Sequence, residues 1–194
     1  PFPPSEAVTL RELLHDPGDH LREVEKRAAA QFGGKAGLHL TDKLADGKLV
    51  VDQGIIAGCA GGMYDNIAEA AAILSGHDTG SGYFSLSVYP PSVPVNLELM
   101  ENGVQQSLLA SGALFKPCFC GPCFGAGDVP ANNGLSIRHT TRNFPNREGS
   151  KPADGQLAGV ILMDARSIAA TARNHGILTS AADVDYTPPA PVQR

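Results

Sequence analysis

Strand-like and helix-like segments alternate from residue 49 onward, and this alternation limits the possible folds of the chain most strongly. Apolar runs of strand length occupy residues 49–57, 83–89, 113–115, 135–139 and 160–162. After the first run, Met63, Ile67, Ala71 and Leu74 recur at the spacing of one helical face. The pattern predicts an α/β fold, a three-layer αβα unit with a mainly parallel sheet. In such sheets, binding residues gather in the loops that follow the carboxyl ends of the strands.

Segments outside this alternation suggest three parts of the chain. Leucines near the start predict a short helix and, after Asp16-Pro17-Gly18, a second helix that ends near Gln31. Residues 35–48 read as a polar connection, and the last residues are rich in proline. We therefore expect an N-terminal helical and linker segment (1–48) that packs on a main domain (49–182), followed by an exit linker (183–194). Within the main domain we expect helices over residues 97–109 and 165–175, the second capped by Asp164.

Charge and hydropathy exclude several classes of partner. The formal net charge of −5 argues against a nucleic-acid binder or an anionic-membrane binder, since both are usually basic. No apolar run approaches the roughly 20 residues that cross a bilayer. The start, Pro1-Phe2-Pro3-Pro4, is not a secretory signal and lacks a methionine, so we expect a piece cut from a longer protein.

Cysteine spacing points to metal or catalytic chemistry. Three of the four cysteines fall within six residues, at Cys118, Cys120 and Cys123, which is a poor distribution for a disulfide framework. Cys120-Gly121-Pro122-Cys123 places two thiolates on one turn, and Cys59 follows another predicted strand of the same sheet. Three thiolates would leave one iron of a four-iron cluster open to water or substrate. Such clustering fits a reducing compartment, and we expect a cytoplasmic location, with the mitochondrial matrix as the alternative.

Three other interpretations of these cysteines stay open at this point. Cys-Gly-Pro-Cys is also the redox motif of thioredoxins, although residues 124–130 are poor helix formers and the chain has no tryptophan. A zinc site could use Cys118 or His139 as a further ligand, although Cys118-Phe119-Cys120 is too tight for an ordinary zinc knuckle. The third alternative is a degenerate scaffold without any cluster.

Two arginines form the second candidate site. Arg142 and Arg147 flank an Asn-Phe-Pro-Asn turn, so both could reach one pocket. Guanidinium groups bind carboxylates through paired, charge-assisted hydrogen bonds. From composition alone, two solvated arginines on a surface loop are the simpler interpretation.

Three motifs in order resemble the aconitase family. They are Gly-Cys at 58–59, Cys-Gly-Pro-Cys-Phe-Gly at 120–125 and Arg-Asn-Phe-Pro-Asn-Arg at 142–147, and the similarity extends over about residues 49–182. The chain looks like the third domain of an aconitase, which supplies all the cysteine ligands of the cluster. Isopropylmalate isomerases match less well, because their cysteine pair usually encloses other residues.

The resemblance implies a [4Fe–4S] hydro-lyase that hydrates or dehydrates a small hydroxy-carboxylate. Cys59, Cys120 and Cys123 would be the cluster ligands, and Arg142 and Arg147 would bind the carboxylates of a di- or tricarboxylate substrate. In the family, the iron without a cysteine ligand is a Lewis acid on the substrate, and a serine alkoxide removes a carbon-bound proton. That serine and the other catalytic residues lie on other domains. The partners would be those remaining domains of the same enzyme, so we expect the isolated chain to fold but not to catalyse. Clusters with an exposed iron are oxygen-sensitive, and an aerobic preparation could be empty.

Departures from the family pattern suggest a diverged branch. The family usually has Gly-Ser-Cys-Thr-Asn around its first ligand, whereas this chain has Ala57-Gly58-Cys59-Ala60-Gly61-Gly62. Side chains that would hydrogen-bond near the cluster are therefore missing, which could shift its potential or weaken it. Thr141 stands where the family usually has Asn, and Cys118 has no family role.

Overall fold

The computed structural model describes residues 7–34, 37–141 and 147–190. Its strands are β1 (Leu44–Ala45), β2 (Lys48–Leu49), β3 (Gln53–Ile56), β4 (Ser85–Val88), β5 (Leu114–Phe115), β6 (Leu135–His139) and β7 (Gly159–Leu162). Its α-helices are α1 (Leu10–His15), α2 (Pro17–Gln31), α3 (Gly58–Gly61), α4 (Tyr64–Leu74), α5 (Val93–Glu101), α6 (Val104–Ala110) and α7 (Ala165–Arg173). Within these described ranges, no helix is long and apolar enough to cross a membrane.

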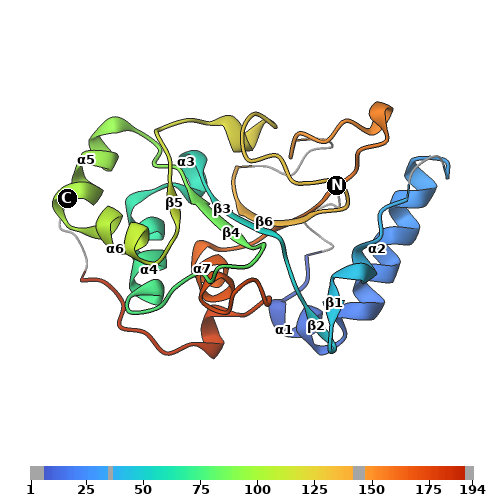
Figure 1. The fold of residues 1–194 in the computed structure, drawn as a ribbon, viewed down its shortest axis with the longest axis horizontal. Coiled ribbons are helices and arrows are strands. Elements are labelled where there is room, and N and C mark those ends of the chain that lie inside the picture. The colour runs from blue at the N-terminus through green and yellow to red at the C-terminus, as the bar shows by residue number, and fades with distance from the viewer. Residues whose placement is uncertain (1–6, 35–36, 142–146, 191–194) are drawn as a thin grey trace.

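A five-stranded sheet forms the centre of the fold (Figure 1). Its strand order is β5-β4-β3-β6-β7, and every neighbouring pair is parallel. The chain therefore leaves β3 toward one edge through β4 and β5, and then returns to the other side of β3 for β6 and β7. The predicted α/β fold with a mainly parallel sheet is confirmed.

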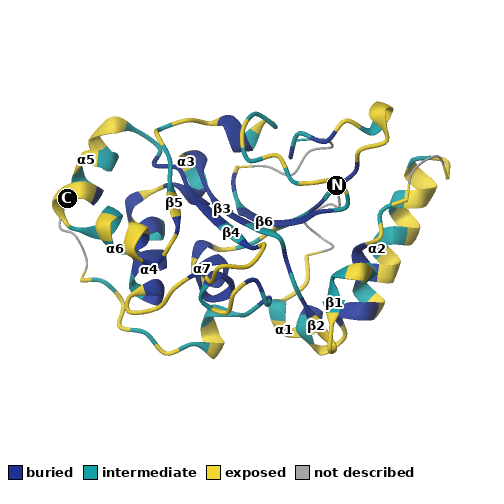
Figure 2. Cartoon of the chain, viewed as in Figure 1, coloured by how far each residue is buried: buried dark blue, intermediate teal, exposed yellow. Residues whose placement is uncertain are grey.

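The two faces of the sheet are covered differently. Helices α4 and α7 pack together against one face, which lies below the strands in Figure 1. Ile56, Val88, Ile137 and Ile168 belong to the large apolar core between these layers. Residues 116–134, which follow β5, lie over the opposite face, where Ile55, Ala57 and Tyr89 form a small separate cluster. Figure 2 shows that the central strands are buried, whereas much of α2 is exposed.

The first predicted strand was too long. Residues 49–57 divide between β2, which pairs with β1, and β3, because the chain turns at Asp52. The Asp52 carboxylate accepts a hydrogen bond from the Leu135 amide at 2.7 Å and pairs with Lys43 at 2.8 Å. Residues 35–48, which were expected to be a polar connection, include a 3₁₀ turn (Leu40–Lys43) and most of the β1–β2 hairpin. Asp46 and Gly47 form its tight turn, and both have positive φ.

The helix expected over residues 97–109 is also two helices. Asn102 ends α5, and Gly103, at φ +73°, starts α6 in a new direction. Glycine adopts this left-handed conformation at little cost, which explains why the chain bends there. The short helix α3 after β3 was not foreseen.

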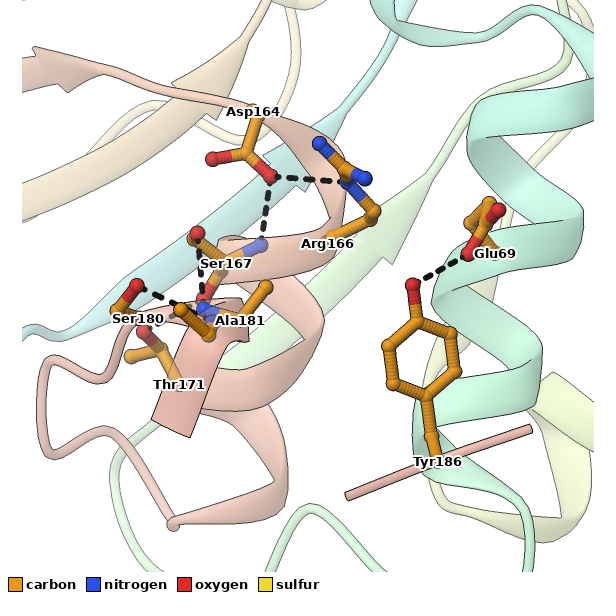
Figure 3. A network of polar contacts seen from close by, with 9 residues as sticks. Glu69, Asp164, Arg166, Ser167, Thr171, Ser180, Ala181 and Tyr186 are labelled. Atoms are coloured by element: carbon orange, nitrogen blue, oxygen red, sulfur yellow. Dashed lines mark hydrogen bonds and ion pairs between the residues drawn. The ribbon is translucent and has the colours of Figure 1, made fainter. Parts of the chain in front are cut away.

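Side chains fix α7 and the segment after it (Figure 3). As expected, Asp164 caps α7, because its Oδ1 accepts a hydrogen bond from the Ser167 amide at 3.0 Å. The Ser167 hydroxyl oxygen accepts a bond from the Ala181 amide at 3.1 Å. Further along, the Tyr186 hydroxyl donates to Glu69 on α4 at 2.7 Å. The segment after α7 therefore runs back across the helical layer.

Candidate metal centre

The centre of the sheet creates a place for a bound group. In open parallel sheets, ligands bind outside the carboxyl ends of strands, where the chain connections diverge to opposite sides. That position here lies between β3 and β6, since β3 continues toward β4 and β6 continues toward β7. Cys59 follows β3 directly. Arg142 follows β6 but lies outside the described residues.

Helix α3 holds Cys59 against the end of β6. The Ala57 amide donates to the His139 carbonyl at 3.1 Å, and Asn66 donates to the Ala60 carbonyl at 2.8 Å. Gly61 leaves no room for a Cβ against the same His139 carbonyl oxygen. Glycine at this position therefore allows α3 to approach β6 closely. Cys59 itself is exposed.

The Cys-Gly-Pro-Cys segment forms a compact turn. Gly121–Cys123 is a 3₁₀ turn, closed by a hydrogen bond from the Cys123 amide to the Cys120 carbonyl at 3.0 Å. The Ala126 amide then donates to the Gly121 carbonyl at 2.9 Å. Cys120 is exposed and Cys123 is half-buried. Two thiols therefore lie on one compact turn.

One contact joins this turn to the loop of Cys59. A Cβ atom built on Gly58 would lie 2.7 Å from the Cys123 Sγ, so the sulfur sits directly against the Gly58 backbone. Gly58 has φ +75°, a conformation that other residues rarely adopt. The fold thus brings Cys123 beside the residue that precedes Cys59, although 64 positions separate the two cysteines in the sequence.

A single-ion site is not formed in the part of the chain that the structure describes. No three His, Cys, Asp or Glu side chains lie together as ligands of one ion there. All four cysteines are free thiols. A cluster connects its cysteines through iron and sulfide, so its ligand sulfurs do not have to surround one ion. Three accessible thiols on two adjoining loops are a donor set that fits such a cluster.

The alternative interpretations gain no support from this geometry. In thioredoxins the reactive thiolate lies at a helix N-terminus, whereas Cys120 here precedes only a three-residue turn. A zinc site would need further ligands from Cys118 or His139 around one ion, and the described residues contain no such group. The Nδ1 atom of His139 is buried without a hydrogen-bond partner, and burial lowers its pKa while Asp164 opposes that shift.

Two arginines donate hydrogen bonds to backbone carbonyls of the cysteine turn. Arg147 Nη1 donates to the Cys123 carbonyl at 3.1 Å, so one of the two sequence-predicted arginines lies beside the thiols. Arg138, on β6, donates to the Pro122 carbonyl at 3.0 Å. Arg138 was not predicted from the sequence. A charged residue in the middle of an apolar strand was the feature that could have revealed it.

Comparison with known proteins gives one consistent result. A family profile described as "Aconitase family (aconitate hydratase)" matches residues 1–170. The 3-isopropylmalate dehydratase large subunit of Bifidobacterium longum subsp. infantis is 29% identical over 187 residues, which are 93% of this chain and 37% of that protein. The large subunit of Nitratidesulfovibrio vulgaris is 30% identical over 131 residues, 67% of this chain and 31% of that protein. Large subunit 2 of Pyrococcus furiosus is 35% identical over 112 residues, 57% of this chain and 29% of that protein.

These relatives bear on the expectation about isopropylmalate isomerases. Isopropylmalate dehydratases are the enzymes also called isomerases, so they give no support to the expectation that this branch matches less well. The chain spans 37% of the length of the Bifidobacterium protein. Most of the length of such a subunit therefore lies outside the region of similarity.

Proposed function

Because the chain belongs to the aconitase family, we propose that it is the cysteine-bearing domain of a hydro-lyase and that Cys59, Cys120 and Cys123 hold a [4Fe–4S] cluster. The observation that supports the proposal most strongly is that the Cys123 sulfur packs against the Gly58 backbone. Two loops that are distant in sequence meet there, because the Cys123 sulfur lies against the residue that precedes Cys59.

Each cysteine has a defined role in this proposal. Cys120 and Cys123, from a single turn, and Cys59, from α3, would each supply one thiolate ligand to the cluster. When bound, the iron without a cysteine ligand supplies Lewis-acid chemistry toward a hydroxyl and a carboxylate of the substrate. Cys118 is half-buried two residues before the first proposed ligand of the turn, and the proposal assigns it no role.

Arg147 would orient the substrate. Its side chain lies beside Cys123 and donates to the Cys123 carbonyl, which places a positive charge next to the cluster ligand. A guanidinium carries five N–H donors in a planar fork, and this geometry suits a carboxylate. Arg142, five positions earlier in the sequence, would bind a second carboxylate. The substrate class is therefore a small hydroxy-acid with two or three carboxylates.

Other parts of the enzyme would supply the acid–base residues. The similar proteins are large subunits, and the chain matches about a third of their length. We propose that the remaining domains or subunits close over the carboxyl end of the sheet and contribute the base that removes the carbon-bound proton. We also propose that the chain divides into an N-terminal helical and linker segment (1–48), a main domain (49–182) and an exit linker (183–194).

Anaerobic reconstitution with iron and sulfide tests the proposal. We expect about four irons per chain, with the visible absorption of a cluster. Cys59→Ser, Cys120→Ser and Cys123→Ser should each lose most of this iron. Cys118→Ser is the matched control, because it removes a thiol from the same loop but not a proposed ligand. Equal iron loss in all four variants, or none in any, would contradict the assignment of ligands.

A further inference from the structure

Arg138 is a charged side chain buried in the centre of the sheet. Its relative exposure is 2%, and it lies on β6, next to β3. A buried charge is costly unless hydrogen bonds and opposite charges compensate for it. The position therefore needs an explanation beyond packing.

The guanidinium connects the strand to the cysteine turn. Nη1 donates to the Pro122 carbonyl at 3.0 Å, and Nη2 donates to the Asp128 carbonyl at 3.1 Å. These two carbonyls lie on either side of Cys123 in the sequence. Nε donates to the Ser136 hydroxyl at 2.9 Å, which fixes the side chain against its own strand.

Neighbouring side chains complete the attachment. Gln53, on β3, donates to the same Asp128 carbonyl at 3.0 Å and accepts a bond from Ser136 at 2.8 Å. The Tyr89 hydroxyl, just after β4, donates to the Asp128 carboxylate at 2.6 Å. The segment from Pro122 to Asp128 is thus attached to β6, to β3 and to the residue after β4, and β3 leads into α3, which carries Cys59.

Charge around Arg138 is also consistent with a role near thiolates. Burial lowers the pKa of Arg138, whereas Glu148, Asp128 and Cys123 oppose that shift. The arginine is therefore a buried cation close to a proposed cluster ligand.

We propose that Arg138 is a positioning residue for the cluster, which holds the Cys120–Cys123 turn in register with Cys59 and offsets the negative charge of the bound thiolates. This inference rests on the proposed function, because it assumes that these cysteines bind a cluster. Arg138 acts through the Pro122 and Asp128 carbonyls and does not contact the substrate.

Hydrogen exchange of the cluster-free chain tests the positional part. We expect Arg138→Met to speed exchange of the amides in residues 118–129 by about tenfold, the factor that corresponds to one charge-assisted hydrogen bond. Exchange in β4 and α4 should not change. Arg173→Met is the control, because Arg173 also donates to a backbone carbonyl, that of Asp185 at 3.0 Å, but far from the cysteines. Unchanged exchange in the turn, or faster exchange throughout the domain, would overturn the proposal.

The reduction potential of the reconstituted cluster tests the electrostatic part. Removing a cation makes the reduced, more negative cluster less favourable, so Arg138→Met should lower the potential. Arg138→Lys keeps the charge and should restore the potential while restoring the slow exchange only in part. It also provides the test if Arg138→Met does not fold. The same potential in Arg138→Met and in the unmodified chain would overturn the electrostatic role.

The two experiments separate this inference from the proposed function. If the unmodified chain takes up no iron, the proposed function fails, while hydrogen exchange still shows whether Arg138 positions the turn. If the unmodified chain binds the cluster and Arg138→Met changes neither exchange nor potential, only the inference fails.

Discussion

Gly58→Ala tests the contact on which the proposed cluster site depends. Alanine at φ +75° costs about 1–2 kcal/mol, because its Cβ approaches the following carbonyl oxygen. The added Cβ would also lie 2.7 Å from the Cys123 sulfur, so that the thiol must move. Overpacking of this kind costs about 1–3 kcal/mol, and the low end applies because a thiol can rotate. We expect a total loss of about 2–3 kcal/mol in the free energy of unfolding.

Gly76→Ala is the matched control. Gly76 has φ +74°, and a Cβ there would meet nothing within 4 Å, so this variant carries the backbone cost alone. In urea denaturation, Gly58→Ala should be less stable than Gly76→Ala by about 1 kcal/mol. After reconstitution, Gly76→Ala should keep its iron and Gly58→Ala should lose most of it. Equal stability and equal iron content in the two variants would refute the placement of Cys123 against Gly58.

Three further predictions concern the scaffold and its pH dependence. Asp164→Ala removes the cap of α7 and should lower the free energy of unfolding by about 1 kcal/mol in urea titrations, whereas Asp164→Asn should recover most of this loss. Tyr186→Phe removes the hydrogen bond to Glu69 and should cost about 1 kcal/mol by the same assay; no change would mean that this bond contributes nothing. Burial and the hydrogen bond to Asp128 raise the pKa of Tyr89, so the stability that this tyrosine contributes is complete below pH 10.0 and is lost as the pH rises above it. The midpoint temperature of thermal unfolding should therefore fall less between pH 8 and pH 11 for Tyr89→Phe than for the unmodified chain. Equal falls would contradict this reasoning.

Regular periodicity made most of the fold predictable. The apolar spacing of Met63, Ile67, Ala71 and Leu74 predicted α4, and short apolar runs predicted the strands of the parallel sheet. The errors arose where turn residues override periodicity. Asp46-Gly47 indicates a hairpin turn, but it lies in a polar segment that was read as a connection. Gly103 indicates a helix break, but the apolar residues on both sides of it were read as one helix.

The candidate site was predictable only in part. Spacing and family resemblance identified Cys59, Cys120 and Cys123, because thiols are rare and specific in sequence. The contact between Cys123 and Gly58 depends on the packing of two loops, which no local pattern encodes. Arg138 was missed because its partners are mostly backbone carbonyls, and any residue type can supply those.

Mössbauer spectroscopy of the chain reconstituted with ⁵⁷Fe is the most direct test of the central claim, that three cysteines hold a four-iron cluster with one open iron. Three cysteine ligands predict that about three quarters of the signal comes from thiolate-bound iron and about one quarter from a distinct site. Only the distinct site should change its parameters when a hydroxy-tricarboxylate or hydroxy-dicarboxylate is added. Four equivalent irons, or a reconstituted chain with no bound iron, would contradict the claim.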